Sequence, residues 1–257
     1  MLISHKHRYL FIEIPNTACT SMKRLLTEHY EAEPVLHKHA TYTEFRRIAS
    51  PEERQYFVFA GIRNPLDSCV TQYMKLKNNH HGRFTDQKRL GTWSLTRRIQ
   101  AKYNFVQREN ADFPMYFRAY VNRVYNNFYL TGHEKFDYVI RFESLQEDLG
   151  EVRRRIGMPT TAELPHVNPT SGKRHFLEYY TPDLYQPAMR VFGPFMLKWG
   201  YQFPSEWGPV RIPWSSQVRF RTMDSFAKLA ARKFGLAPNS HGRVMEILRN
   251  TVRAVWA

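Results

Sequence analysis

Three short apolar runs, each followed by a polar turn and an amphipathic segment, dominate the pattern of hydrophobic positions in this chain. They cover residues 9–14, 56–62 and 137–142. Nearly continuous apolar runs of this length are typical of strands that are covered on both faces of a parallel sheet. The three repeats predict an α/β fold, a P-loop-like three-layer sandwich with a central parallel sheet flanked by helices. Ligands of such a fold bind at the C-terminal ends of the strands.

The turns after these runs carry the signals that begin helices. Thr20 or Ser21 is the expected N-cap after the first run. Asn64 is expected to cap the next helix, with Pro65 in its first turn. The third run precedes S-L-Q-E at residues 144–147, which predicts a capping box.

Two regions stand outside this repeat. Residues 78–135 are rich in Arg, Asn, His and aromatics, and we expect helices there that cover the site and shape an acceptor pocket, with 112–130 the clearest helix. Residues 210–222 are predicted to be a linker to two short amphipathic helices. The expected division is a domain at 1–206 and a basic C-terminal helical arm at 207–257. The apolar faces of the two helices in the arm are Phe226, Leu229, Ala230 and Phe234, and Val244, Ile247, Leu248, Val252 and Val255.

The charge of the chain favours anionic partners. Lysine and arginine number 38 against 23 acidic residues, which gives a net charge of +15. Nucleotides, acidic or sulfated sugars, nucleic acid and anionic lipid headgroups all suit this balance. Nucleic acid is disfavoured, because many basic residues lie around the candidate loops and in the arm and do not form a stripe with interleaved aromatics. The arm suits an anionic membrane surface, and packing on its own domain or on a second subunit in a homodimer is an equal alternative.

Cysteine usage and the N-terminal pattern indicate the compartment. Cys19 and Cys69 each lie inside a motif and are expected to be packed thiols in a reducing environment. The N-terminal apolar run ends at Pro15 and does not resemble a secretory signal. No stretch approaches the roughly 20 apolar residues of a membrane span. We therefore expect a cytoplasmic chain, with peripheral attachment to a membrane as an open alternative.

The loop at residues 15–21 has the composition of an anion site. A polar loop that ends a buried strand and opens a helix directs several backbone N–H groups and the positive end of the helix dipole at one point. The hydroxyls of Thr17, Thr20 and Ser21 and the Lys23 ammonium can add side-chain donors. Neither glycine of a Walker loop is present, which disfavours a nucleoside triphosphatase.

Two motifs resemble a known family. I-P-N-T-A-C-T-S-M-K-R-L-L resembles the 5′-phosphosulfate loop of sulfotransferases that use 3′-phosphoadenylyl sulfate (PAPS), in particular the carbohydrate branch. I-R-N-P-L-D-S-C-V-T-Q-Y is similar to the 3′-phosphate motif of that family, and the resemblance spans residues 8 to about 203. It implies that Arg63 offers the 3′-phosphate a forked guanidinium and that Thr71 stands for the family's serine. It implies a 5′ site at Pro15, Asn16, Thr17, Ala18, Cys19, Thr20 and Ser21.

A histidine-containing stretch lies between these motifs. H-K-H-A-T-Y-T-E-F, at residues 37–45, is similar to the H-x-H-[VA]-[ST] stretch of the glycan 2-O-sulfotransferases and their bacterial relatives. Sulfuryl transfer to a hydroxyl needs a base, and neutral imidazole has a suitable pKa. His39 is the expected base, with His37 as an orienting or acceptor-binding partner. Glu44 is an alternative base, and a loop histidine without a task is also open because the chain has 11 histidines.

A third stretch, P-H-V-N-P-T-S-G-K-R-H-F-L-E-Y-Y-T-P-D-L, is similar to a family segment that lies over the nucleotide. This resemblance implies that Lys173 and Arg174 are candidates for binding the 3′-phosphate or an acidic acceptor. Ser171 is a candidate for a hydrogen bond. Tyr179 and Tyr180 are expected to pack against the sheet.

Two positions depart from the family pattern. Asn16 stands where the family loop has a lysine that stabilises charge on the leaving group, and Lys23 is the expected substitute. Ser68 replaces the usual arginine of the 3′-phosphate motif, which weakens that site unless Lys173 or Arg174 compensates.

The resemblance as a whole implies a metal-free sulfotransferase. It would move a sulfuryl group from PAPS to a hydroxyl of a carbohydrate or glycoconjugate and release adenosine 3′,5′-bisphosphate (PAP). The first loop and Arg63 would bind opposite ends of one nucleotide. The alternative is a non-catalytic module that binds nucleotide or sulfated glycan on the same fold, and Asn16 keeps it open.

Overall fold

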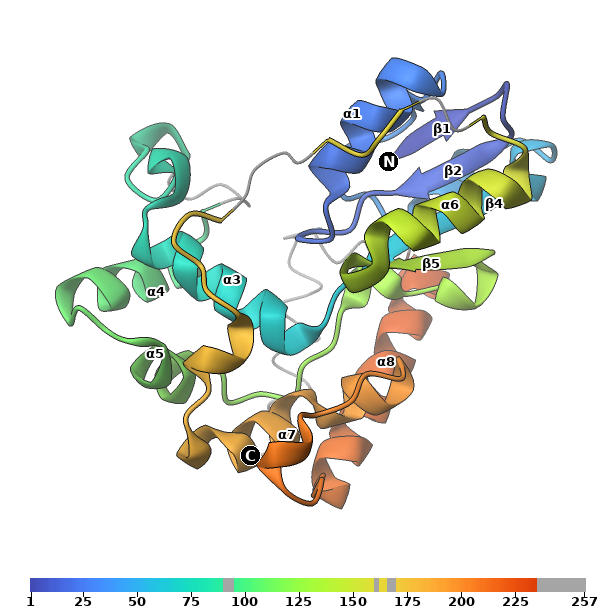
Figure 1. Ribbon diagram of the computed structural model, residues 1–257. Coiled ribbons are helices and arrows are strands. Elements are labelled where there is room, and N and C mark those ends of the chain that lie inside the picture. Colours follow the sequence, from blue (N-terminus) through green and yellow to red (C-terminus); the bar gives the residue numbers. More distant parts are fainter. Residues whose placement is uncertain (90–94, 160–161, 166–169, 235–257) are drawn as a thin grey trace. The chain divides into compact units, whose positions relative to one another are not determined.

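The structure is a computed structural model that describes residues 1–89, 95–159, 162–165 and 170–234 (Figure 1). The chain divides into two compact units, which are described separately. Unit 1 comprises Met1–Ile62, Asn127–Val167 and Asp224–Ala257, and unit 2 comprises Arg63–Asn126 and Asn168–Met223. The predicted boundary at residue 207 stays a prediction.

Five strands of the described residues form one sheet in unit 1, in the order β3-β1-β2-β4-β5. β2 (Tyr9–Ile12), β4 (Phe57–Ile62) and β5 (Tyr138–Arg141) are parallel neighbours and correspond to the three apolar runs. β1 (Leu2–Ser4) pairs antiparallel with β2 and with β3 (Glu33–Pro34). The sheet is therefore mixed, and the expectation of a parallel sheet is wrong at this edge. The connection from β1 to β2 is too short for a parallel crossover, so these strands can only be antiparallel.

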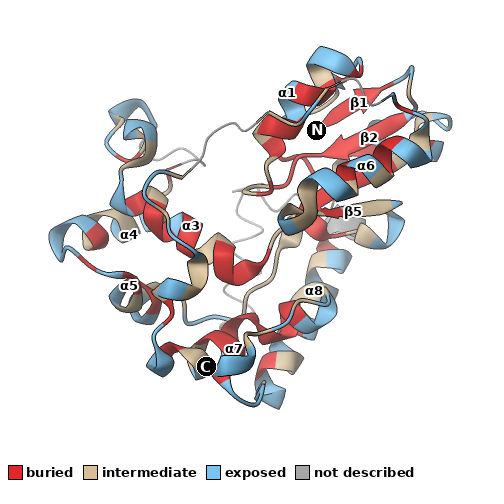
Figure 2. Cartoon of the chain, in the orientation of Figure 1, coloured by how far each residue is buried: buried red, intermediate tan, exposed pale blue. Residues whose placement is uncertain are grey.

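Both faces of the sheet are buried, which explains why its parallel strands are apolar at nearly every position (Figure 2). α1 (Cys19–His29) and α6 (Leu145–Ile156) pack their apolar sides in one cluster with strand residues of a single face. α2 (Tyr42–Ile48) buries Tyr42 and Phe45 elsewhere in the unit. The cluster under α1 and α6 includes Tyr9, Phe11, Phe59, Ile140, Met22, Leu25, Leu26, Leu149 and Val152, and the buried strand residues of the opposite face include Leu10, Ile12, Val58 and Ala60.

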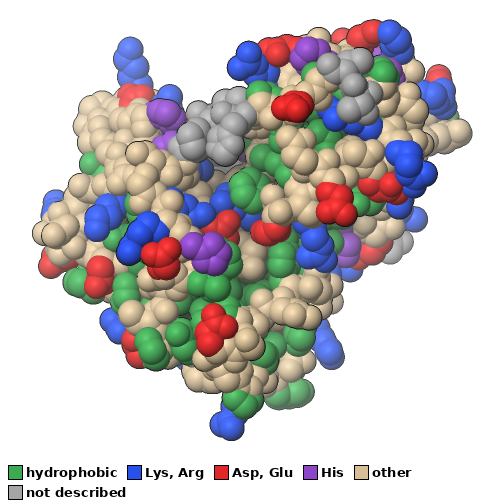
Figure 3. Space-filling model, viewed as in Figure 1, with side chains coloured by type: hydrophobic (Ala, Val, Ile, Leu, Met, Phe, Trp, Pro, Cys, Tyr) green, Lys and Arg blue, Asp and Glu red, His purple; other side chains and the backbone are tan. Residues whose placement is uncertain are grey.

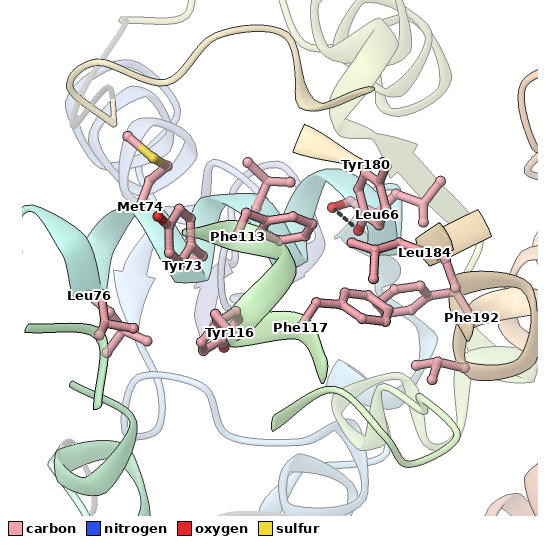
Figure 4. Close-up of a cluster of buried hydrophobic side chains, with 14 of the residues drawn as sticks. Leu66, Tyr73, Met74, Leu76, Phe113, Tyr116, Phe117, Tyr180, Leu184 and Phe192 are labelled. Atoms are coloured by element: carbon pink, nitrogen blue, oxygen red, sulfur yellow. Dashed lines mark hydrogen bonds between the residues drawn. The ribbon is translucent and has the colours of Figure 1, made fainter. Parts of the chain in front are cut away.

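Unit 2 is built from helices around an aromatic core (Figure 4). Its helices are α3 (Pro65–Lys77), α4 (Arg97–Arg108), α5 (Phe113–Tyr120) and α7 (Pro182–Lys198). Rings from α3, α5 and α7 meet edge to face in this core, an arrangement that aromatic side chains prefer. Short 3-10 turns in the chain lie at Glu53–Gln55, His80–Gly82, Gln87–Arg89, Phe128–Leu130, His133–Lys135, Phe142–Ser144, Phe176–Tyr179 and Ser205–Trp207.

Tyr179 and Tyr180 belong to this helical core, so the expectation that they pack against the sheet is wrong. The Tyr180 hydroxyl donates a hydrogen bond to the Leu66 carbonyl at 3.1 Å, as Figure 4 shows. The Tyr179 ring contacts the rings of Tyr73 and Phe113. The reason is that the 3-10 turn Phe176–Tyr179 packs against α3 within unit 2.

Of the three N-terminal helix caps predicted from the sequence, one agrees in full with the structure. Asn64 caps α3 as predicted, and its side-chain oxygen accepts from the Leu66 N–H at 2.9 Å. α1 has Ala18 as its N-cap in place of Thr20 or Ser21. Ser144 is the N-cap of α6 but forms no capping box, because its hydroxyl donates to Asp148 Oδ2, which also accepts from the Arg141 N–H.

Two further boundaries differ from expectation. α5 covers only Phe113–Tyr120 of the helix predicted at 112–130, and its end is followed by irregular backbone. The predicted linker at 210–222 is helical from Trp214 onward, where α8 (Trp214–Phe234) begins directly after Pro213. Proline is favoured at the start of a helix, so Pro213 indicates the beginning of α8 and not a linker. The second amphipathic helix predicted for the arm lies outside the described residues.

The state of the two cysteines and the character of the described helices can be compared with the expected packed thiols and the expected absence of a membrane span. Neither cysteine forms a disulfide. Cys19 is buried, and burial raises the pKa of the Cys69 thiol on α3 to about 12, in keeping with packed thiols. Among the described helices, none combines the length and apolar character needed to cross a bilayer.

Gly61 near the end of β4 gives a test of packing in unit 1. A Cβ at this position would lie 2.7 Å from Thr17 Oγ1 and 2.8 Å from Thr17 Cβ, so Gly61→Ala should lower the free energy of unfolding by about 1–3 kcal/mol. Gly150 in α6 is the matched control, because a Cβ there meets nothing within 4 Å. Gly150→Ala should raise the free energy of unfolding by about 0.5–1 kcal/mol. Urea unfolding measures both, and equal effects of the two substitutions would contradict the tight fit of Thr17 on Gly61.

Candidate functional site

The loop after β2 adopts glycine-like backbone conformations without containing glycine. Asn16 has φ +65° and Ala18 has φ +58°, both in the left-handed region. Asparagine accepts this region more readily than most residues, whereas alanine is strained there by roughly 1–2 kcal/mol. The departure from the family lysine at position 16 therefore places a side chain that suits the local backbone.

Thr17 holds this loop against the sheet. Its hydroxyl donates to the Ile14 carbonyl at 2.8 Å, and its side chain is buried against Gly61. In this conformation the hydroxyl hydrogen of Thr17 is used within the loop. Thr17 thus shapes the loop, and its expected role as a donor to phosphate would fall to its backbone.

The N-terminus of α1 offers the features of an anion site. Its N-cap, Ala18, provides no side-chain hydrogen bond, and its first turn contains no acidic residue. Cys19 and Ser21 are buried and Thr20 is half-buried in that turn. Backbone N–H groups and the positive end of the helix dipole favour an anion at such a position.

Lys23 and Pro15 flank this turn on either side. Pro15 is half-buried where the chain leaves the strand. Lys23 is exposed on α1, just beyond the first turn, and no ion pair holds it among the described residues. Its long side chain is thus not committed to another charge of unit 1.

His39 is buried and held by the backbone next to the same strand. Its Nδ1 lies 2.6 Å from the Glu13 carbonyl oxygen, which can only accept, so Nδ1 carries the hydrogen and the neutral ring has its lone pair on Nε2. The ring packs edge-on against Tyr129 at 6.0 Å. Burial is the main cause that lowers the pKa of His39 below the ordinary value of 6.5, and the nearby Lys38 ammonium adds to it. A buried, neutral imidazole of fixed tautomer is suited to act as a base.

His37 and Glu44 occupy different environments from His39. The His37 side chain is exposed, and its Nε2 lies 3.7 Å from Glu44 Oε1. Glu44 Oε2 accepts hydrogen bonds from the N–H and the hydroxyl of Thr41 at the start of α2. Because its carboxylate closes this capping box, Glu44 has a structural task, and the T-Y-T-E pattern at residues 41–44 was the sequence signal for it.

In unit 2, two of the predicted cations share one carboxylate. Arg63 places Nε 2.8 Å and Nη2 2.7 Å from Asp67 Oδ2, and the Lys173 ammonium pairs with Asp67 Oδ1. The three side chains are only 10–15% exposed. Lys173, and not Arg174, therefore joins Arg63. Asp67 was not singled out from the sequence, although its place four residues after Arg63 in the first turn of α3 is a signal for such a pair.

The other predicted 3′-phosphate residues differ in the contacts that their side chains make. Thr71 is one turn after Asp67 on α3, and its hydroxyl oxygen is buried without a hydrogen-bond partner within the described part of the chain. Ser171 is exposed, and it is its carbonyl that accepts a hydrogen bond, from the Asn78 side chain at 2.7 Å. Arg174 pairs with Glu178 at 3.1 Å and is thus committed elsewhere. Residues 166–169 of the same predicted segment lie outside the described residues.

Comparison with known proteins gives one match. A family model described as the sulfotransferase family matches residues 1–192, a span that contains the loop after β2, His39 and the residues around Asp67. No curated protein matches the chain, and no solved structure does. Since the match covers most of the 257 residues, the chain belongs to the sulfotransferase family.

Proposed function

We propose that this protein transfers a sulfuryl group from PAPS to a hydroxyl of a carbohydrate or glycoconjugate. Membership of the sulfotransferase family supports sulfuryl transfer. The observation that carries the choice of donor is the pair of cations on Asp67 together with the unpartnered Thr71 hydroxyl, in the segment that resembles the 3′-phosphate motif. A site for a 3′-phosphate separates PAPS from adenine nucleotides that lack this group, such as adenosine triphosphate.

The proposed donor contacts divide by the end of the nucleotide. The N–H groups of residues 15–21 and the start of α1 take the 5′-phosphosulfate, because the positive end of the helix dipole favours an anion and the first turn of α1 contains no acidic residue. Arg63, Lys173 and Thr71 take the 3′-phosphate, which has oxygens for several donors. Arg174 and Ser171 have smaller roles in this assignment, because Arg174 pairs with Glu178 apart from the Asp67 cluster and Ser171 contributes its carbonyl to a hydrogen bond from Asn78.

The proposed reaction is an in-line displacement at sulfur. The acceptor oxygen forms a bond to sulfur while the bond from sulfur to the 5′-phosphate oxygen breaks, and PAP leaves with that electron pair. The acceptor proton passes to Nε2 of His39, which carries the lone pair in the neutral ring. The N-terminus of α1 and the Lys23 ammonium stabilise the negative charge that develops on the leaving phosphate.

The acceptor class is the finer part of the proposal. Exposed basic side chains in the region between the second and third predicted repeats, including Arg97, Arg98 and Arg108, suit an acidic glycan more than a small phenol. The resemblance of the H-x-H stretch to glycan 2-O-sulfotransferases points the same way.

A non-catalytic module is the second candidate, and Asn16 is the observation that favours it. The lysine that the family places there is absent, so charge on the leaving group must be stabilised by other groups. This candidate shares the nucleotide contacts and lacks turnover. Transfer, and not nucleotide binding, separates the two.

His39 gives the direct test of transfer. With labelled PAPS and a panel of polysaccharide acceptors, we expect label to move to an acidic glycan, and His39→Gln to lower kcat by on the order of a hundredfold or more. His29→Gln is the control, because His29 is an exposed histidine on α1. Binding of PAP without any transfer by the unaltered protein would favour the non-catalytic module.

The lowered pKa of His39 predicts a position for the acid limb of the pH profile. The neutral ring is the active form, so kcat/KM should fall as pH decreases through the pKa of His39, with a midpoint below 6.5. His39→Gln should remove this limb from the residual rate. A midpoint above 6.5 that survives the substitution would assign the base to another group.

A substitution of Lys23 tests whether this residue replaces the lysine that the family has at position 16. Lys23→Ala should lower kcat by on the order of ten- to a hundredfold, because a preorganised charge near the leaving phosphate is lost. Thermal unfolding should not change, since the side chain is exposed. Arg24→Ala is the matched control, because this neighbour is also exposed and pairs with Glu28 on the same helix. Equal rates of the two variants would remove Lys23 from the mechanism.

A further inference from the structure

Asp67 in unit 2 contacts two of the three predicted phosphate-binding cations, Arg63 and Lys173. It uses a different oxygen for each: Oδ2 for Arg63 and Oδ1 for Lys173. The two positive groups therefore lie at the two ends of a single carboxylate. Two cations this close repel each other unless an anion lies between them, and Asp67 supplies that anion before any ligand is present.

The backbone around both cations is fixed, so the carboxylate acts on the ends of their side chains. Asn64 caps α3 directly after Arg63. The turn that carries Lys173 is tied to the C-terminal end of α3 by the hydrogen bond from Asn78 to the Ser171 carbonyl. Gly172 takes a left-handed φ of +67° in this turn. Arginine and lysine have flexible side chains, and holding them in advance lowers the entropy lost when a ligand binds.

We propose that Asp67 is a positioning residue that holds Arg63 and Lys173 together as one site for the 3′-phosphate of the donor. The assignment rests on the proposed function, since it presumes that this cluster takes the 3′-phosphate. It also accounts for Ser68, because Lys173 supplies the second cation that the family places at position 68. Asp67 does not itself contact the phosphate.

The carboxylate of Asp67 has two properties that the side-chain amide of an asparagine lacks. It has two equivalent acceptor oxygens, so it can pair with two cations, whereas an asparagine offers one oxygen and a donor that repels the other cation. It also carries the charge that offsets their repulsion. Asp67→Asn therefore releases at least one cation with little change in size, and Asp67→Glu keeps both properties.

A competing role makes the opposite prediction. If Asp67 only occupied the cations in place of phosphate, its negative charge would oppose the ligand, and Asp67→Asn would tighten binding. A purely structural role would change the affinity for all nucleotides alike. The affinity for PAP relative to adenosine 5′-monophosphate separates these roles, because only PAP has a 3′-phosphate.

Isothermal titration of the full chain with PAP and with adenosine 5′-monophosphate is the test. The unaltered protein should prefer PAP, and Asp67→Asn should weaken PAP binding by on the order of tenfold while the affinity for the monophosphate stays within about twofold. Asp67→Glu should restore most of the preference. Lys173→Ala should weaken PAP binding in the unaltered background and have a smaller effect in combination with Asp67→Asn, because the two residues act as a unit.

Asp183 provides the matched control. It is also an aspartate in the first turn of a helix of unit 2, and it pairs with Arg118 on the surface. Asp183→Asn should leave the preference for PAP unchanged.

The outcomes distinguish this inference from the proposed function. If the unaltered protein shows no preference for PAP, the 3′-phosphate assignment fails, and the role of Asp67 fails with it. If the preference exists and survives Asp67→Asn, or if that variant binds PAP more tightly, only the positioning role is overturned. Should Asp67→Asn not fold, Asp67→Glu and Lys173→Ala still decide: an effect of Lys173→Ala on the monophosphate equal to its effect on PAP contradicts the shared site.

Discussion

The parallel pairing of β2 with β4 is the constraint on which the rest of unit 1 depends. Ile12 lies opposite Ala60 in this pairing, so the loop that leaves β2 begins beside the end of β4. Gly61 has no side chain to keep that loop away, and Thr17 packs directly on it. With Thr17 fixed, the chain turns into α1, whose N-cap, Ala18, makes no side-chain hydrogen bond to the first turn. The shape of the candidate anion site thus follows from strand pairing and one close approach, without a glycine in the loop itself.

The loop reaches its shape by a different route from a glycine-rich loop. Left-handed backbone at Asn16 and Ala18 costs free energy, and unit 1 maintains it because Thr17 between them is anchored on both sides. His39 is likewise left-handed, at φ +66°, and it is the residue whose ring the Glu13 carbonyl fixes. Strained residues that persist in a folded protein are often found where function requires a fixed geometry. Three of the eight described non-glycine residues with a left-handed φ, namely Asn16, Ala18 and His39, lie in the candidate site.

Many of the positive charges of the chain lie next to acidic side chains. On the face shown in Figure 3, lysine and arginine side chains are interspersed with acidic and neutral ones. Several of the cations are paired, including Arg174 with Glu178, and Arg63 and Lys173 with Asp67. A positive net charge attracts anions in general, whereas the buried pair on Asp67 offers two donors at a defined place. In the proposed function, specific recognition of the 3′-phosphate would therefore depend on where Asp67 holds the two cations, and net charge would contribute attraction over a longer range.

The sequence by itself determined the three parallel strands and the cap at Asn64, because strand and cap signals depend on residues that are close together in the chain, and it pointed to the segments of the candidate site. It did not determine β1 and β3, whose pairing depends on residues far apart in the chain, or the extent of α8. It identified Arg63 and Lys173 as candidates and could not bring them together, since 110 positions separate them (173 minus 63). Only the tertiary structure placed Asp67 between them and Glu13 against His39, because burial and hydrogen bonding are properties of residues that meet in space.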